Sequence, residues 1–220
     1  MNSAFNWDIF DKMPVIAIMR NFPPGKLVRV VDALQQAGFT NLEITMNSQD
    51  PLQTINDLRE RWAGKMNIGA GTVCNKHQLK EAISAGAQFI VAPIASEEII
   101  KSSKSAGIPI FPGAYTPTEI YMAWEWGASM VKVFPATKLG AGFIKDVLEP
   151  LGHIKLLPTG GINIDNFIEF FKAGASGVGI ASSLFPKELI NEERWDELNL
   201  FYASFINRYH QFIKEKQKND

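Results

Sequence analysis

Five segments of this 220-residue chain share one order: a helix-like stretch, a small residue, a glycine and then an apolar run. Glycine directly after a helix adopts the left-handed conformation that closes the last helical turn. An apolar run follows each glycine within a few residues, which is typical of strands alternating with helices in parallel β-α units. The five glycines are Gly38, Gly86, Gly107, Gly127 and Gly174.

Eight apolar runs are candidate strands, and they lack the polar alternation of strands that face water on one side. They are Val15–Met19, Leu42–Thr45, Ile68–Gly71, Phe89–Ala92, Ile108–Phe111, Met130–Phe134, Ile154–Pro158 and Gly177–Ile180. Helical stretches lie between them, and a short extra helix is expected before the first strand. This pattern predicts an α/β fold, a compact (β/α)8 TIM barrel formed as a single domain by residues 1–220.

An open doubly wound sheet is the alternative fold. That fold usually places a glycine-rich phosphate loop after its first strand, whereas the first strand here runs into "MRNFPPG". The barrel is therefore the favoured prediction.

Composition limits the partners and cofactors of the protein. Lys and Arg number 22 against 23 Asp and Glu, so the chain has no excess of basic residues for binding nucleic acid. No apolar run is long enough to span a bilayer, and the first residues do not resemble a signal peptide. The histidines are widely spaced and form no metal motif. We expect a cytoplasmic protein with no metal, no other cofactor and no membrane partner.

Two ionisable residues interrupt buried strands: Lys132 in "MVKVF" and Glu43 in "LEIT". Lys132 could be paired with a buried carboxylate, or it could extend to the barrel rim. Alternatively, burial lowers the pKa of its amine, which then attacks a carbonyl substrate and forms a Schiff base. Such chemistry needs a second group to move protons, and Glu43 is the candidate.

Two glycine-rich turns follow the last two predicted strands. Gly160 and Gly161 lie in "PTGGIN", and Ser182 follows the eighth strand in "GIASSLF". Each turn alone could be merely structural. Loops after strands seven and eight of a TIM barrel commonly bind phosphate, so the pair indicates a phosphate or carboxylate site.

The chain resembles the class I aldolases for 2-keto-3-deoxy-6-phosphogluconate and 4-hydroxy-2-oxoglutarate, with their phosphogalactonate relatives. Five motifs in order carry the resemblance: "LEITMNS", "IGAGTV", "VKVFPA", "PTGGI" and "GIASSLF". The resemblance implies that Lys132 forms the Schiff base and that Glu43 transfers protons. It also implies a homotrimer without metal. The residues expected to bind substrate are Thr72, Pro93, Phe134, Thr159, Gly160, Gly161 and Ser182.

The chain departs from the pattern at one position. Many members that cleave phosphogluconate carry an arginine that meets the pyruvate carboxylate, where this chain has Asn47. Phosphogalactonate aldolases resemble the chain there and carry an arginine after the first strand, which would be Arg20. We therefore expect Arg20 to supply the charge for the carboxylate, with Asn47 beside it. The "PTGG" turn looks more like the phosphogluconate type, so the preferred C4 epimer stays open.

The expected activity is a lyase reaction on a keto acid. It splits 2-keto-3-deoxy-6-phospho sugar acids into pyruvate and glyceraldehyde 3-phosphate, with 4-hydroxy-2-oxoglutarate, which would yield pyruvate and glyoxylate, as a side substrate. Two alternatives are a phosphosugar isomerase on the same barrel and a non-catalytic sensor of keto acids or phosphosugars.

Overall fold

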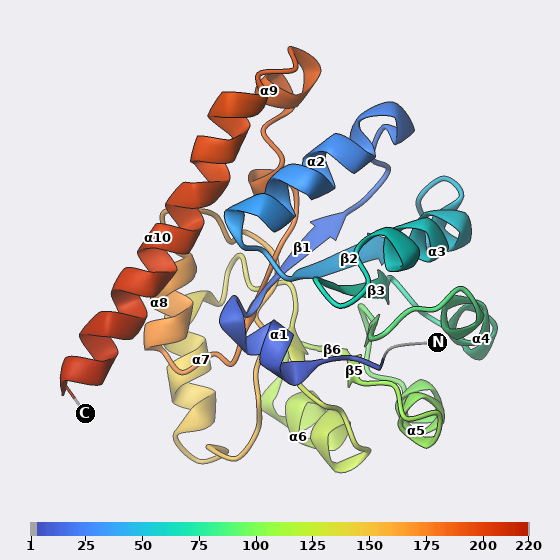
Figure 1. The fold of residues 1–220 in the computed structure, drawn as a ribbon. Helices are drawn as coiled ribbons and strands as arrows, with labels where there is room; N and C mark the ends of the chain where they lie inside the picture. Colours follow the sequence, from blue (N-terminus) through green and yellow to red (C-terminus); the bar gives the residue numbers. More distant parts are fainter. Residues whose placement is uncertain (1–3, 220) are drawn as a thin grey trace.

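A computed structural model describes residues 4–219 and shows parallel strands that form the centre of the molecule, with helices outside them (Figure 1). Six strands form one sheet in the order β5-β4-β3-β2-β1-β8, and β6 pairs with β7 in a second sheet. The strands are β1 (Val15–Met19), β2 (Asn41–Thr45), β3 (Asn67–Gly71), β4 (Ile90–Val91), β5 (Ile110–Phe111), β6 (Gly113–Ala114), β7 (Lys132–Val133) and β8 (Val178–Ile180).

The two sheets join into a ring. Pro112 alone separates β5 from β6, and two parallel bridges, Val131 with Leu156 and Thr159 with Gly179, connect the β7 region to β8. The ring has the geometry of the predicted barrel. The strand expected at 154–158 is reduced to an isolated bridge, although its backbone bonds to Val131 and Val133 on the neighbouring segment.

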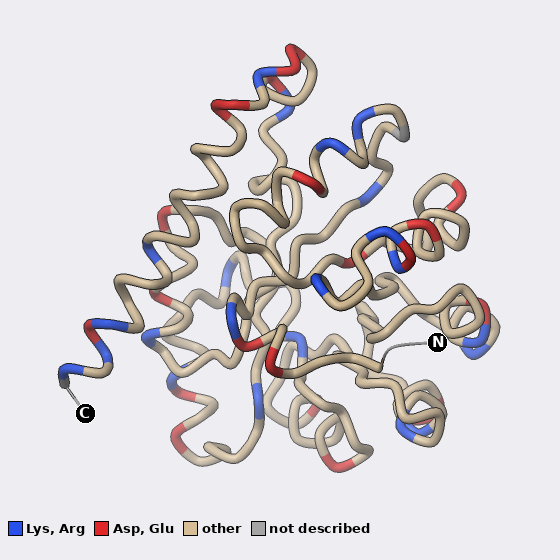
Figure 2. The backbone as a smooth tube through the Cα atoms, in the orientation of Figure 1, with Lys and Arg blue, Asp and Glu red and all other residues tan. Residues whose placement is uncertain are grey.

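Helices surround this ring and alternate with its strands. They are α1 (Trp7–Lys12), α2 (Pro24–Ala37), α3 (Pro51–Arg61), α4 (Lys76–Ser84), α5 (Glu97–Ser105), α6 (Pro117–Glu125), α7 (Gly140–Leu148), α8 (Phe167–Lys172), the 3₁₀ helix η1 (Ser182–Leu184), α9 (Lys187–Asn191) and α10 (Trp195–Asn219). The five predicted helix-closing glycines all have positive φ angles, from 70° to 115°. Figure 2 shows most charged residues on these helices and the loops. No helix among residues 4–219 is long and apolar enough to cross a membrane.

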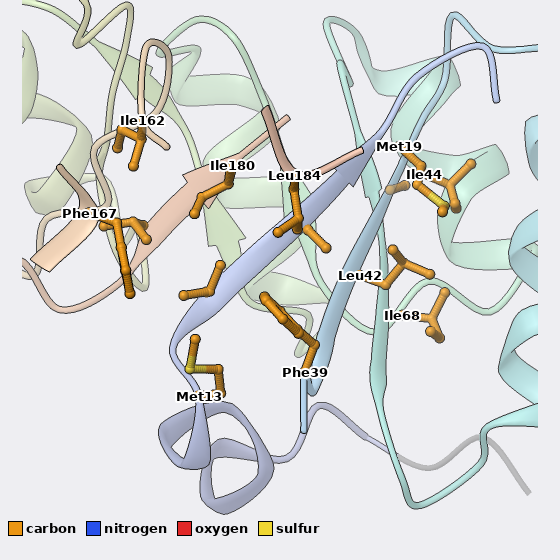
Figure 3. Close-up of a cluster of buried hydrophobic side chains, with 14 of the residues drawn as sticks. Met13, Met19, Phe39, Leu42, Ile44, Ile68, Ile162, Phe167, Ile180 and Leu184 are labelled. Atoms are coloured by element: carbon orange, nitrogen blue, oxygen red, sulfur yellow. The ribbon is translucent and has the colours of Figure 1, made fainter. Parts of the chain in front are cut away.

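Alternate residues of each strand face two different layers. Val15, Ala17 and Met19 of β1 pack outward against the helices, while Ile16 and Ile18 join a separate cluster inside the barrel. Figure 3 shows part of the outward cluster, in which Leu42, Ile44 and Ile68 lie with residues of other elements. The position of a residue in this alternation therefore decides whether it faces the helices or the lumen.

Aromatic side chains close the N-terminal end of the barrel. Phe10 of α1 lies in the inner cluster with Phe89 and Phe111, and Phe5 and Trp7 pack against it. The ring centroids of Phe5 and Phe89 are 5.6 Å apart in an edge-to-face contact. This packing fills the lumen at the N-terminal ends of the strands. A binding site can therefore form only at their C-terminal ends, as is usual in this fold.

Candidate active site

Lys132 points into the barrel. Its neighbours Val131 and Val133 both belong to the outward cluster, so the alternation of β7 turns the lysine toward the lumen. Only 6% of its surface is exposed, and its Nζ lies 4.7 Å from the centroid of the Phe134 ring. Burial lowers the pKa of the amine, the Glu43 charge opposes this, and the Arg20 charge adds to it. The net effect is a lowered pKa, so the Lys132 amine loses its proton more readily than an exposed lysine does.

Glu43 faces the same lumen by the same rule. Leu42 and Ile44 pack outward, and Glu43 is 1% exposed. Burial raises the pKa of its carboxyl, while the positive charges of Lys132 and Arg20 partly offset that rise. Among the described residues, the buried oxygen Oε2 has no hydrogen-bond partner. The lumen thus contains an acid and an amine whose pKa values burial moves toward each other, which is typical of functional sites.

Arg20 stands directly after β1 and is exposed, and its charge acts on both Lys132 and Glu43. The turn after β1 is bonded to the turn after β2, because Ser48 Oγ accepts the backbone N–H of Asn21 at 2.9 Å. Asn47 lies exposed in that second turn and lines neither of the two cavities described next. Of these two residues, Arg20 is therefore the one that lines a cavity and supplies a charge that acts on the buried pair.

Two cavities flank the lumen at this end of the barrel. One, of about 550 Å³, is lined by Ile18, Arg20 and Ser182 together with residues of the α9 region, including Lys187. The other, of about 320 Å³, is lined by Pro93 and Phe134 together with residues of β6 and α6. Arg20 and Ser182 are thus brought together, as are Pro93 and Phe134.

The glycine-rich turn after Thr159 has free backbone donors. Gly160 and Gly161 have φ angles of 99° and 73°, and neither N–H has an acceptor among the described residues. The N–H groups of Ser182 and Ser183 are likewise without an acceptor in the described chain. Ser183 Oγ donates to the carbonyl of Ile162 at 2.5 Å, which joins this turn to η1. Clustered free N–H groups of this kind bind anions.

Thr72 and Thr159 differ in how deeply they are buried. Thr72 is half-buried directly beyond β3 and has a φ of 58°, an uncommon angle for a residue other than glycine. Thr159 is 4% exposed, and its hydroxyl donates to the carbonyl of Leu157 at 3.4 Å. Neither lines the two cavities, so their contact with substrate stays a prediction.

Two further residues of the site, Lys187 and Gly71, have no distinguishing signal in the sequence. Lys187 resembles any surface lysine in the sequence, and only its place in the cavity with Arg20 distinguishes it. Gly71 is the last residue of "IGAG", and its contact with Glu43 comes from the neighbouring strand. Among the described residues, no group of three His, Cys, Asp or Glu side chains could hold a metal ion.

Known proteins resemble the chain over most of its length. The family described as KDPG and KHG aldolase matches residues 8–201. The 2-dehydro-3-deoxy-6-phosphogalactonate aldolase of Escherichia coli is 34% identical, covering 92% of this chain and 98% of its own. The 2-dehydro-3-deoxy-phosphogluconate aldolase of Haemophilus influenzae is 35% identical, covering 89% and 91%.

Two solved structures of aldolases with the same kinds of names are similar to the chain in fold. A native KDPGal structure superposes with a TM-score of 0.84 at 31% identity, covering 92% of this chain and 97% of its own. A KDPG aldolase from Legionella pneumophila, with pyruvate captured as a covalent carbinolamine intermediate, gives a TM-score of 0.81 at 26% identity, covering 90% and 96%.

Proposed function

Because the chain belongs to the KDPG and KHG aldolase family, we propose that it is a class I aldolase that acts through a Schiff base. Its substrates are 2-keto-3-deoxy-6-phospho sugar acids, which it cleaves into pyruvate and glyceraldehyde 3-phosphate. The observation that carries the proposal is the pair of inward-facing groups, with a buried amine on β7 and a buried carboxyl on β2. The carbinolamine of the Legionella pneumophila relative supports the same chemistry.

The reaction follows from these two groups. The neutral Lys132 amine attacks the C2 carbonyl, and Glu43 protonates the departing hydroxyl as the carbinolamine loses water and becomes an iminium. Glu43 then takes the proton of the C4 hydroxyl, the C3–C4 bond breaks, and its electron pair moves toward the iminium nitrogen. The aldehyde leaves, the enamine is protonated at C3, and water releases pyruvate and restores the amine.

The phosphate of the substrate is assigned to the turn at Gly160 and Gly161 and to the start of η1. The unbonded N–H groups there support this assignment, since an anion would satisfy donors that the described chain leaves without acceptors. Lys187 lines the adjoining cavity with Ser182 and adds a positive charge on the same side.

The Arg20→Ala variant is expected to raise KM for keto acids about 30- to 100-fold, and Asn47→Ala less than about 10-fold. Losing a charged partner costs roughly 2–5 kcal/mol and losing a neutral hydrogen bond about 1–3 kcal/mol, and solvent at the exposed Arg20 favours the lower end. Steady-state kinetics of both variants measure the difference. A near-neutral Arg20→Ala with a severe Asn47→Ala would contradict the assignment.

The same variants show which anionic group Arg20 binds, because Arg20 shares a cavity with Ser182. Pyruvate has a carboxylate and no phosphate, so its half-saturation in borohydride trapping reports on the carboxylate alone. We expect Arg20→Ala to weaken trapping by pyruvate as well as cleavage of the phosphorylated substrate. Weakened cleavage with unchanged trapping would instead assign Arg20 to the phosphate. Arg20→Lys is the control that keeps the charge but loses the planar pair of donors.

Both C4 epimers of the phosphorylated substrate are candidates. The relatives named for phosphogalactonate and phosphogluconate are 34% and 35% identical, so similarity favours neither. A coupled assay of pyruvate release with each epimer, and with 4-hydroxy-2-oxoglutarate, tests the proposed activity and ranks the substrates. Release from none of them would exclude the proposed function.

Assembly into a homotrimer is proposed through an exposed apolar surface beside the smaller cavity. Ile94, Tyr115, Tyr121 and Met122 are between 40% and 49% exposed, and clustered apolar surface of this kind marks interfaces. A structural neighbour with a TM-score of 0.86 at 31% identity, covering 94% of this chain and 76% of its own, is a protein cage designed by fusing symmetric oligomeric domains.

The Met122→Lys variant is expected to change the solution mass from that of three chains to that of one. A lysine in the centre of an apolar interface leaves a charge without a partner, which opposes association. Light scattering after size exclusion gives the mass. Leu200→Lys, at the 72% exposed Leu200 of α10, is the control and should remain a trimer. A single-chain mass for the unaltered protein would contradict the proposal.

A further inference from the structure

The position of the Glu43 carboxyl is not fixed by hydrogen bonds within the described chain. Oε2 is buried without a partner, and no described donor bonds to Oε1. Buried polar side chains usually have at least one hydrogen bond that holds their orientation. Some other feature of the barrel must therefore determine where this carboxyl lies.

Gly71 provides that feature from the neighbouring strand. In the register between β2 and β3, Glu43 is opposite Gly69, and Gly71 is opposite Thr45, two residues nearer the C-terminal end. A Cβ atom built on Gly71 would overlap Oε1 and Cδ of Glu43 and would lie 2.6 Å from Cγ. The Glu43 side chain thus extends toward the open end of the barrel and occupies the space that a side chain at position 71 would fill.

The other inward glycine of β3 has a different neighbour. A Cβ atom on Gly69 would come within 2.5 Å of the Phe89 ring, which belongs to the inner apolar cluster. Gly69 therefore makes room for the core, and Gly71 makes room for the carboxyl. Neither has a φ in the left-handed region, so an alanine at either position conflicts with the neighbouring side chain and not with the backbone.

We propose that Gly71 is a positioning residue for Glu43: the missing side chain at position 71 sets the place of the carboxyl in the lumen. Packing holds the carboxyl without tying either oxygen to a donor. One carboxyl can therefore turn between the carbinolamine hydroxyl, the C4 hydroxyl and water, which the reaction requires of it. The inference rests on the proposed function of Glu43 as the group that transfers protons.

Gly71→Ala is the direct test. The added methyl group must displace the carboxyl, and a misplacement of about 1 Å in a catalytic group costs on the order of 100-fold in rate. We expect kcat to fall about 100-fold, KM to stay within about threefold, and Lys132 still to be labelled by pyruvate and borohydride. Gly69→Ala is the matched control from the same strand and face. It is expected to lower the melting temperature through Phe89 while kcat stays within about threefold of the unaltered enzyme, well short of that loss.

Removing the Glu43 side chain gives the second test. In a Glu43→Ala background the three atoms that the methyl group of Gly71→Ala would meet, Oε1, Cδ and Cγ of Glu43, are absent. We expect Gly71→Ala to lower the melting temperature when Glu43 is present and to leave it unchanged in the Glu43→Ala background, as a double-mutant cycle would show for two side chains in contact. This double variant also keeps the proposal testable if Gly71→Ala alone does not fold.

Equal changes of melting temperature in the two backgrounds, or a Gly71→Ala enzyme with normal kcat, would overturn the positioning role. Glu43→Gln separates this failure from failure of the proposed function. If Glu43→Gln is inactive while Gly71→Ala is fully active, only the role of Gly71 is wrong. If Glu43→Gln is active, the proton-transfer function of Glu43 is wrong as well.

Discussion

Replacing Lys132 by methionine is expected to abolish both cleavage and covalent capture of pyruvate while the barrel stays folded. Methionine has a similar length and fits an apolar lumen, but it offers no nucleophile. Lys132 is only 6% exposed, and burial already disfavours its charged form. The melting temperature should therefore remain unchanged or rise, because an amine in a dry site is a cost to the fold.

Mass spectrometry after treatment with pyruvate and borohydride measures this result. The unaltered enzyme should gain one pyruvate-derived group on the peptide that contains Lys132, and the Lys132→Met enzyme should gain none. Lys145→Met, at an exposed site on α7, is the control and should keep both label and activity. Active enzyme without a label at Lys132 would exclude the Schiff base and favour an isomerase in which the lysine acts only through its charge. Binding without any turnover would favour the sensor.

Glu43→Gln is expected to lower kcat about 10²- to 10⁴-fold while substrate still binds, since general acid–base groups contribute that much. Glutamine keeps the size of the side chain and cannot exchange the proton. Glu125→Gln, at an exposed position on α6, is the control and should be near normal. A Glu43→Gln enzyme within about threefold of the unaltered rate would be far above the expected range and would remove Glu43 from the mechanism.

The pH dependence of the same pair gives an independent check. Formation of the Schiff base needs a neutral Lys132 amine for the attack and a protonated Glu43 carboxyl for the loss of water. Burial lowers the pKa of Lys132 and raises that of Glu43. On the acid side kcat/KM falls as the amine takes up a proton, and on the alkaline side it falls as the carboxyl loses one. A bell-shaped profile follows. In Glu43→Gln the alkaline decline should disappear and leave a single rise with pH.

The sequence predicted the barrel and the two inward ionisable groups for a definite physical reason. A charge inside an apolar strand is rare enough to stand out, and strand alternation then determines the direction of its side chain. The boundaries of the short strands were less predictable. The run Phe89–Ala92 contributes only β4, and β6 has no signal in the sequence because "PGA" lacks an apolar run.

The side-chain contacts between neighbouring strands could not be predicted from the sequence. Nothing in "IGAG" shows that Gly69 adjoins a phenylalanine and Gly71 a glutamate, because both neighbours come from other segments of the chain. Lys187 has no signal in the sequence for a similar reason, since its cavity is formed by residues from opposite ends of the chain. Sequence identifies which residues are unusual for their place, and only packing identifies which ordinary residues surround them.

The alternation that turns Lys132 inward also limits how this enzyme could diverge. Inserting or deleting one residue directly before Val131, just ahead of β7, would exchange the two faces of the strand, so the amine would enter the helix layer and a valine would take its place. The same holds for Glu43 in β2. Descendants of this chain could gain new substrates by lengthening the loops at the open end, but within these two strands they could change only by substitution.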